Sequence, residues 1–431
     1  MPLINTLLEC GCDVTAHDKA KREDIPEKAD SLEKLGAKLR LGEDYLDNID
    51  GEIIFRTPGL HPDTPGIKKA VAAGAELTSE MELFFKVCPC RIIAITGSDG
   101  KTTTTTIISE LLKAAGYNVH LGGNIGKPLL TEADSYGEKD IAVLELSSFQ
   151  LITMCCDPDV SVITNLAPNH LDIHKDMDEY ISSKKNIFKG QSADKVLVLN
   201  LDNDITASFI PEATAKVRCF SRRQAVSEGA HCLDGKIYLN GDYLMDAAEI
   251  FIPGVHNVEN FLAAFSAVDG MVPREVMVRT AREFKGVEHR IEHVRCLRGV
   301  DYYNDSIASS PSRTTAGLNS FEKKVILIAG GKDKGVPFDS LSDIIMDRVK
   351  LLVLTGAARG KIRSALESNP RYSGQPPVVE YQVFKDAVLG AAERAEPGDV
   401  VILSPACTSF DCFKNFAERG NKFKEIVMGL E

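Results

Sequence analysis

The sequence has no run of apolar residues close to the roughly 20 that are needed to cross a bilayer, and no basic segment followed by an apolar one at its start. Basic residues are outnumbered: 50 Lys and Arg stand against 62 Asp and Glu, which gives a formal net charge of −12. Because phosphate backbones need clustered Lys and Arg, this balance argues against a dedicated nucleic-acid binder. We therefore expect a cytosolic protein that holds any anionic ligand by local charge.

The cysteines have no spacing that points to a metal site or a redox pair. Their number, 11, is odd. Neither Cys88-Pro-Cys90 nor the adjacent Cys155 and Cys156 fits a zinc ribbon or a CxxC motif. In a reducing compartment such residues are better explained as buried free thiols, which we expect here.

Short apolar runs alternate with helical patterns along almost the whole chain, which is typical of parallel sheets covered by helices. A length of 431 residues is too great for one core and indicates roughly three domains. We predict an α/β protein with a Rossmann-like domain at 1–86, a central P-loop ATPase-like domain at 87–285 and a Rossmann-like C-terminal domain at 286–431. Strands are expected at 13–18, 52–56, 141–146, 160–164, 195–200, 324–328, 351–355 and 400–403.

The start of the chain fits this scheme poorly. Residues 3–8 have the apolar spacing of the first helix of a Rossmann-like unit, but the strand and glycine loop that normally precede this helix are not in the sequence. That strand usually lies near the centre of the sheet. We therefore expect that the first domain is truncated and that Met1 is not the true start.

The most informative segment is 92–103, which joins an apolar strand to a glycine-containing loop and then to a helix. Gly97 and Gly100 allow successive backbone N–H groups to face one anion. Lys101 adds a positive charge for the outer phosphates, and Thr102 offers a hydroxyl to Mg²⁺. Because the next helix points the positive end of its dipole at the same anion, a nucleotide triphosphate is the expected ligand.

Polar residues also follow two further strands, at the sheet edge where parallel α/β folds bind ligands. Glu145 comes after four apolar residues, which indicates a buried carboxylate suited to Mg²⁺. His170 follows the next strand and suits a metal or a phosphate, although a lone histidine is more often structural. Lys184 lies in a helical segment, where nothing in the pattern distinguishes it from a surface lysine.

Taken together, these segments resemble the Mur ligase family, which builds the peptide of bacterial cell-wall precursors. The loop at 96–103 is similar to the version in that family, which also lacks the early glycine replaced here by Ile95. Segments 122–126 and 144–151 look like those of the member that adds D-glutamate. The resemblance extends over all three predicted domains through segments 256–260, 289–290, 304–306 and 404–411.

The resemblance implies an ADP-forming amide ligase that uses ATP and Mg²⁺ in peptidoglycan synthesis. A carboxylate of UDP-N-acetylmuramoyl-L-alanine attacks the γ-phosphate, and the amine of D-glutamate then displaces phosphate from the acyl phosphate. Lys101 and Mg²⁺ stabilise the charge on the transferring phosphoryl group. Both substrates are small molecules, and we expect a cytoplasmic monomer that neither binds nucleic acid nor inserts into a membrane.

The resemblance also implies a role for each matching residue. The expected catalytic residues are Lys101, Glu145, His170 and Lys184. Those at the metal are Thr102, Glu145, His170 and Lys184, where the lysine would be carbamylated and so become an anion. The nucleotide is expected at Gly97, Ser98, Asp99, Gly100, Lys101, Thr102, Thr103, Asn257, Asn260, Arg290 and Asp305. The substrates are expected at Asp18, Thr57, Pro58, Gly59, Asn124, Ser147, Ser148, Gln150, Ser309, Lys334, Ser409, Phe410 and Phe416.

Some points stay open at this level. Ile307 stands where related sequences often have lysine, with Arg313 as the candidate replacement, and Lys332 competes with Lys334 for the D-glutamate carboxylate. One alternative is another Mur ligase or a folylpolyglutamate synthetase-like enzyme, against which segments 146–150 and 404–411 argue. The other is a nucleotide-binding protein that has lost catalysis; the short N-terminus favours it, whereas the retention of the four catalytic residues argues against it.

Overall fold

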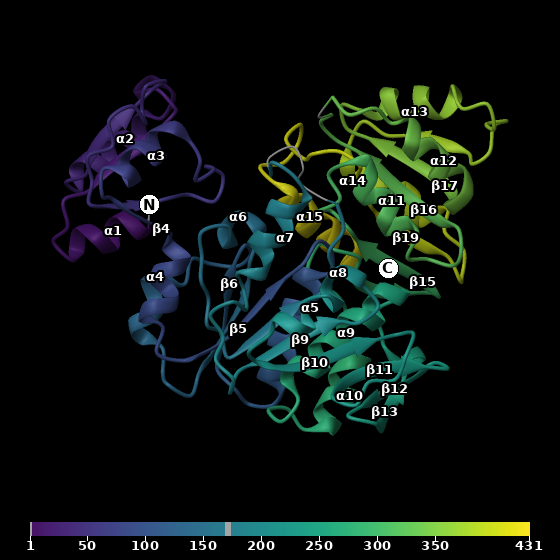
Figure 1. The fold of residues 1–431 in the computed structure, drawn as a ribbon. Coiled ribbons are helices and arrows are strands. Elements are labelled where there is room, and N and C mark those ends of the chain that lie inside the picture. The colour runs from purple at the N-terminus through teal and green to yellow at the C-terminus, as the bar shows by residue number, and fades with distance from the viewer. Residues whose placement is uncertain (1, 169–173, 334) are drawn as a thin grey trace. The chain divides into compact units, whose positions relative to one another are not determined.

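A computed structural model describes residues 2–168, 174–333 and 335–431 (Figure 1). Contacts divide the chain into two compact units. The first contains Met1–Ala247 and Val258–Thr280, and the second contains Ala248–Asn257 and Ala281–Glu431. Both units mix helices with sheets that are mostly parallel. Within the described residues, none of the helices is long and apolar enough to span a bilayer.

The N-terminal part of the first unit consists of two small parallel strand pairs, each connected through a helix. In the first pair, β1 (Thr15–Asp18) is joined to β2 (Lys38–Leu41) by α2 (Pro26–Lys34), and α1 (Pro2–Glu9) precedes it. In the second, β3 (Ile53–Phe55) is joined to β4 (Glu76–Thr78) by α3 (Pro65–Ala72). Both connecting helices begin with proline, whose fixed φ suits the first helical position. The strands predicted at 13–18 and 52–56 are therefore confirmed, with shorter bounds.

A nine-stranded sheet carries the rest of this unit. Its order is β13-β12-β11-β10-β9-β8-β5-β7-β6, and all neighbouring strands are parallel except that β12 runs antiparallel to β11 and β13. The next strands along the chain, β6 and β7, lie on one side of β5, whereas β8 and the later strands lie on its other side. The strand order therefore reverses at β5. Ligands bind at such reversal points, beyond the carboxyl ends of the strands. The strands are β5 (Arg91–Thr96), β6 (Val119–Gly123), β7 (Ile141–Glu145), β8 (Val160–Ile163), β9 (Val196–Asn200), β10 (Lys216–Ser221), β11 (Gly229–Leu233), β12 (Lys236–Leu239) and β13 (Asp242–Asp246).

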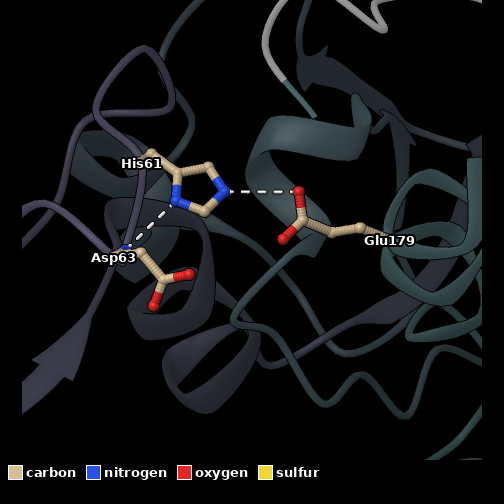
Figure 2. Close-up of side chains that lie close together, drawn as sticks. All are labelled: His61, Asp63 and Glu179. Atoms are coloured by element: carbon tan, nitrogen blue, oxygen red, sulfur yellow. Dashed lines mark hydrogen bonds and ion pairs between the residues drawn. The ribbon is translucent and has the colours of Figure 1, made fainter. Parts of the chain in front are cut away.

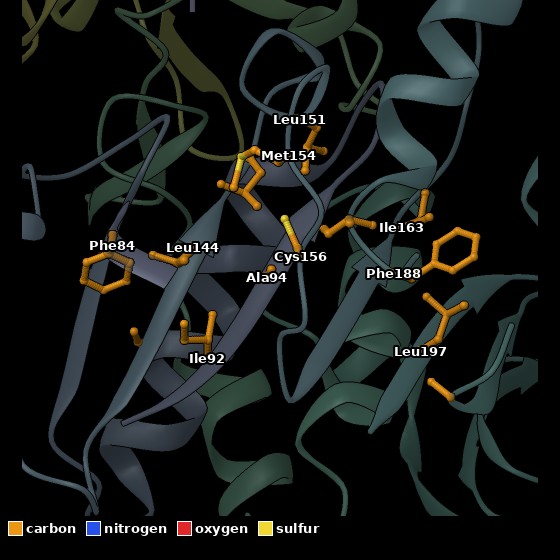
Figure 3. Packing of buried hydrophobic residues seen from close by; sticks show 14 of the residues in the cluster. Phe84, Ile92, Ala94, Leu144, Leu151, Met154, Cys156, Ile163, Phe188 and Leu197 are labelled. Carbon is orange, nitrogen blue, oxygen red and sulfur yellow. The ribbon is translucent and has the colours of Figure 1, made fainter. Parts of the chain in front are cut away.

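Apolar residues on one face of this sheet pack against helices to form a continuous core, part of which Figure 3 shows. Phe84 and Leu151 come from helices on that face, whereas Ile92, Leu144 and Leu197 come from the strands. Helix α5 packs on β5, β6 and β7. The helices that come after α3 up to residue 283 are α4 (Glu80–Val87), α5 (Lys101–Ala114), α6 (Ser148–Leu151), α7 (Met177–Lys185), α8 (Asp204–Ala207), α9 (Val255–Val268) and α10 (Arg274–Glu283).

The second unit is built on a six-stranded sheet of order β14-β15-β19-β16-β17-β18, in which only the edge strand β14 is antiparallel. One face packs against α11, α12 and α13, and the other against α14 and α15. The elements are β14 (Glu292–Leu297), β15 (Val300–Asn304), α11 (Pro311–Leu318), β16 (Val325–Gly330), α12 (Asp339–Arg348), β17 (Val349–Thr355), α13 (Arg359–Glu367), β18 (Val378–Glu380), α14 (Phe384–Glu393), β19 (Val400–Leu403) and α15 (Phe416–Met428).

The prediction of buried free thiols is only partly correct. All 11 cysteines are free, but five of them are exposed. These five lie mainly in turns and loops, where no core faces them, and one lies on the edge strand β14; they are Cys10, Cys12, Cys155, Cys296 and Cys412.

Candidate active site

The phosphate loop lies where the sequence places it, between the end of β5 and the start of α5. Gly97 has φ 150° and Gly100 has φ 78°. A Cβ atom on Gly97 would lie 1.9 Å from Thr164 Oγ1, and one on Gly100 would lie 2.4 Å from Asn260 Oδ1. Both positions therefore require glycine. Thr164 also donates its hydroxyl to the Asp99 carbonyl oxygen at 2.6 Å, which fixes the loop to the end of β8.

Lys101 is the first residue of α5 and lies over this loop. Its Nζ donates to the carbonyl oxygens of Gly97 and Ser98, each at 2.8 Å. The Ser98 hydroxyl is in turn 2.8 Å from the hydroxyl of Tyr180 on α7. The ammonium group is thus held beside the loop amides at the positive end of α5, an arrangement suited to the outer phosphates of a nucleotide. Two predicted nucleotide contacts come next in the helix, half-buried Thr102 and buried Thr103.

Glu145 ends β7 and is only 1% exposed, as the four apolar residues before it in the sequence predict. Asn124 Nδ2 donates to Glu145 Oε1 at 2.8 Å, and the Asn124 N–H donates to the Glu145 carbonyl oxygen at 2.7 Å. Oε2 is buried and has no hydrogen-bond partner among the residues described. Leaving a carboxylate oxygen in this state is costly, and a divalent cation satisfies it. The donor set at this strand end therefore fits Mg²⁺.

Lys184, which the sequence could not distinguish from a surface lysine, is 2% exposed. Its Nζ donates to Thr96 Oγ1 at 3.1 Å and to the Gly97 carbonyl oxygen at 2.9 Å, and it lies 5.0 Å from the centre of the Tyr180 ring. Burial lowers the pKa of Lys184 well below its ordinary value, and the charge of Lys101 lowers it further, while Glu145 opposes both. A buried amine with a lowered pKa is an unusual group, and such groups cluster at functional sites.

Charged side chains link the loop after β3 to the start of α7 (Figure 2). His61 Nε2 lies 3.4 Å from Glu179 Oε2, and the Asp63 N–H donates to His61 Nδ1 at 3.1 Å. Lys175 pairs with both Asp63 and Glu179. His174, whose ring stacks on that of Phe149, also lies 3.4 Å from Glu179. Three of these residues have the spacing of cation ligands, but Lys175 already supplies positive charge, so we describe the group as an ionic link.

Several predicted substrate residues meet at a cavity of about 290 Å³ within the first unit. Thr57 and Pro58, in the exposed loop with Gly59, line it together with Gln150. Ser147 and Gln150 also bond each other in a capping box at the start of α6, which by itself accounts for both side chains. The remaining two lie apart: Ser148 Oγ is 2.9 Å from His174 Nε2, and Asp18 accepts from the Ala20 N–H and from Lys28.

In the second unit, Asp305 follows β15 and is 3% exposed. Ser404 Oγ donates to Asp305 Oδ2 at 2.7 Å, and the Ile291 N–H donates to Oδ1 at 3.4 Å. Burial raises the pKa of Asp305 to about 7, against the lowering effects of Ser404 and of the half-buried Arg290. Asn257 is 7% exposed and donates Nδ2 to the Pro253 carbonyl oxygen at 2.6 Å.

Asp305→Asn is expected to stabilise the protein more as the pH rises. The folded-state pKa of Asp305, about 7, exceeds the ordinary value of 3.8. The folded state therefore binds the proton of this carboxyl more tightly than the unfolded state does. The wild-type free energy of unfolding is thus undiminished below pH 3.8 and falls as the pH rises from there to about 7. Since each pKa unit corresponds to about 1.4 kcal/mol, the variant should gain a few kcal/mol above neutral pH. Urea denaturation of both proteins at about pH 5 and about pH 8 measures this gain; an equal difference at both pH values would contradict it.

The predicted D-glutamate residues in this unit differ widely in exposure. Ser409 is 2% exposed, Phe410 64% and Phe416 39%, while Ser309 is half-buried. Arg313, the candidate replacement for a basic group at 307, reaches the Ile307 carbonyl oxygen at 3.5 Å. His170 and Lys334 lie outside the described residues.

Sequence reasoning missed Arg419, which is 2% exposed on α15. Its Nε and Nη2 donate to Ser306, and Nη2 also donates to the Cys407 carbonyl oxygen at 3.1 Å. Among the described residues, nothing accepts a bond from its buried Nη1. Burial lowers the pKa of Arg419 to about 10. A guanidinium with such a buried N–H beside segment 404–411 is suited to a carboxylate ligand. In the sequence, only its position three residues after Phe416 on the same helix could have suggested it.

Two models of known protein families match the parts of the chain that contain the two large sheets. A family model described as the Mur ligase middle domain matches residues 95–268, and one described as the Mur ligase, glutamate ligase domain matches residues 289–407. A UDP-N-acetylmuramoylalanine--D-glutamate ligase of Acetivibrio thermocellus is 52% identical over 438 residues, which cover 100% of this chain and 94% of that protein. A protein of the same name from Clostridium novyi is 50% identical over 432 residues, with the same coverage.

Solved structures with low sequence identity share the fold. UDP-N-acetylmuramate-alanine ligase from Thermotoga maritima matches with a TM-score of 0.58 at 18% identity, over 99% of this chain and 96% of that one. A MurF ligase from the same organism, in complex with ADP, matches with a TM-score of 0.57 at 16% identity, over 96% of both chains.

Proposed function

This chain belongs to the Mur ligase family, and we propose that it joins D-glutamate to UDP-N-acetylmuramoyl-L-alanine while ATP is converted to ADP and phosphate. Relatives about half identical over the whole chain carry the name of this reaction. The observation that carries the chemistry is the placement of one buried carboxylate, Glu145, and one buried amine, Lys184, around a phosphate loop.

The residues at the phosphate loop are suited to phosphoryl transfer from ATP. The loop amides and Lys101 bind the outer phosphates and stabilise the charge that develops as the γ-phosphoryl group leaves. The substrate carboxylate attacks this group to form an acyl phosphate. The amine of D-glutamate then attacks the acyl carbon, phosphate departs, and the amine proton is released as the amide forms.

Mg²⁺ would be held by Glu145 and Thr102, together with His170 and Lys184, and would neutralise charge on the phosphates. We propose that Lys184 contributes as a carbamate. Its amine adds to CO₂ with loss of one proton, which gives an anionic ligand in place of a cation. The lowered pKa supports this assignment because only the neutral amine reacts with CO₂.

The finer organisation is part of the same proposal. We propose that residues 1–86 bind the UDP group, 87–285 bind ATP, and 286–431 contribute Asp305 and Arg290 to the nucleotide and Ser409, Phe410, Phe416 and Lys334 to D-glutamate. The buried Nη1 of Arg419, which has no acceptor within the described residues, supports a carboxylate site in this last segment. We also propose that the enzyme acts as a monomer in the cytoplasm.

Phosphate release is expected to require ATP, Mg²⁺, UDP-N-acetylmuramoyl-L-alanine and D-glutamate together. The reason is that the acyl phosphate forms only on the first substrate and turns over only with the second. A coupled phosphate assay that omits each component in turn tests this. Equal release with L-glutamate or meso-diaminopimelate would overturn the specificity and favour another ligase of the family. Nucleotide binding without release under any condition would favour the non-catalytic alternative.

A further inference from the structure

Arg56 directly follows β3 and is buried in a loop whose next residues are exposed. Its exposed fraction is 4%, whereas Thr57, Pro58 and Gly59 are all exposed. Burial lowers the pKa of Arg56, and the nearby Glu82 carboxylate opposes this. Removing a guanidinium from water is costly unless its N–H groups find acceptors. The acceptors that Arg56 finds therefore indicate what it holds in place.

One side of the guanidinium organises the loop itself. Nη1 donates to three backbone carbonyl oxygens, those of Thr57 at 3.3 Å, Pro58 at 3.3 Å and Leu60 at 2.8 Å. In a trans peptide unit the C=O and the N–H point in opposite directions. Because the Pro58 and Leu60 carbonyls face Arg56, the N–H groups of Gly59 and His61 face away from it. Backbone N–H groups that point outward from a turn are available to donate hydrogen bonds to an anion.

The second NH₂ group of the guanidinium, Nη2, connects this loop to α6, a helix of the large sheet. Nη2 donates to the Phe149 carbonyl oxygen at 2.7 Å and lies 3.4 Å from Thr153 Oγ1. Phe149 belongs to α6, which also carries Gln150, and Arg56 and Gln150 line the same cavity. The far end of the loop is held separately, by His61 at Glu179 of α7 (Figure 2) and by Asp63 at Lys175, just before that helix. Arg56 thus connects the turn at 57–60 to α6 and to the turn that follows this helix.

We propose that Arg56 is a positioning residue for the diphosphate part of the first substrate. Its hydrogen bonds to the Pro58 and Leu60 carbonyl oxygens orient the N–H groups of Gly59 and His61 away from the guanidinium. Its bond to the Phe149 carbonyl oxygen fixes the position of the loop relative to α6. This inference rests on the proposed function, since it takes UDP-N-acetylmuramoyl-L-alanine as the ligand of that loop. Arg56 itself does not touch the reacting atoms.

Arg56→Lys and Arg56→Met test the proposal. Lysine keeps the charge but lacks the two separate NH₂ groups with which Arg56 reaches the loop and α6 together, and methionine removes both the charge and the donors. Both variants should raise the KM for UDP-N-acetylmuramoyl-L-alanine by about 10- to 100-fold, the range for a lost charge-assisted bond, with methionine the larger. The KM values for ATP and D-glutamate should stay within about twofold, because their residues are not held by this loop. Titration calorimetry with UDP alone should show the same order of weakening.

Arg218→Lys is the matched control. Arg218 also donates to backbone carbonyl oxygens, those of Ser266 at 3.0 Å and Asp269 at 3.2 Å, but none of its contacts belongs to a proposed site. This variant is expected to change thermal stability without changing any KM. If Arg56 only stabilises the fold, its variants will behave like the control, with activity lost in proportion to the folded fraction and KM unchanged. That result would overturn the positioning role and leave the proposed function intact, since wild-type ligation is measured in the same assay.

Discussion

Lys184→Ala is expected to lower kcat by about a hundred- to a thousandfold, the scale of losing a preorganised group that stabilises charge on the transferring phosphoryl group. The substitution removes the amine that donates to Thr96 Oγ1 and to the Gly97 carbonyl oxygen, where β5 ends and the phosphate loop begins. It also removes the group that we propose becomes a carbamate and holds Mg²⁺. Steady-state phosphate release under saturating substrates measures the effect.

The neighbouring Lys185→Ala is the matched control, because Lys185 lies on the same helix but pairs with Glu212 away from the loop. It should retain nearly full activity. Short carboxylic acids are expected to restore part of the activity of the Lys184 variant by supplying the missing carboxylate, and to leave the wild type unchanged. ¹³C-bicarbonate should produce a carbamate signal in the NMR spectrum of the wild type that is absent from the variant. A Lys184 variant with more than about a tenth of wild-type kcat would contradict the assignment.

Glu145→Gln should abolish turnover to a similar degree without destabilising the protein. The substitution keeps the shape of the side chain and the oxygen that accepts from Asn124, but it removes the buried negative charge. Its second oxygen, which has no partner within the described residues, is replaced by an uncharged NH₂ group, which is not a ligand for Mg²⁺. Because a buried carboxylate oxygen without a hydrogen-bond partner is costly, the melting temperature of the ligand-free variant should equal or exceed that of the wild type.

Thermal shift with and without Mg-ATP separates binding from folding for this variant. Wild-type protein should be stabilised by Mg-ATP, since a ligand that binds only the folded state raises the melting temperature. The Glu145 variant should lose most of that increase, whereas Glu132→Gln, at an exposed acid on the same unit, should retain it. A normal Mg-ATP shift together with normal kcat would exclude Glu145 as a metal ligand.

The features that could be predicted from sequence are those set by local pattern. The strand, loop and helix at 92–114 are encoded in consecutive residues, and the apolar run before Glu145 predicts its burial correctly. Most predicted strands occur within a residue or two of their observed bounds because buried parallel strands are continuous apolar runs. The hairpin strands β11–β13 were not predicted; they are short, and β12 and β13 carry polar residues on exposed positions.

The features that could not be predicted depend on contacts between distant parts of the chain. Lys184 is buried because the phosphate loop, 87 or more residues earlier, packs over it and supplies its acceptors. Arg56 and Arg419 likewise look like ordinary surface arginines until Phe149 and Cys407 are placed beside them. In each case the residue type can be read from the sequence, while tertiary packing determines that its charge lies away from water.

The division of the chain into its two compact units has a practical consequence for dissecting the enzyme. The chain leaves the first unit after Ala247, returns to it at Val258, and leaves again after Thr280. The short segment 248–257 packs with the C-terminal segment 281–431: Glu249 pairs with Arg282, and the Phe251 N–H donates to the Ala281 carbonyl oxygen. A recombinant fragment that begins at residue 281 therefore lacks part of its own packing. For the same reason, a protease cut after Ala247 leaves two polypeptides that remain interleaved rather than two separable halves.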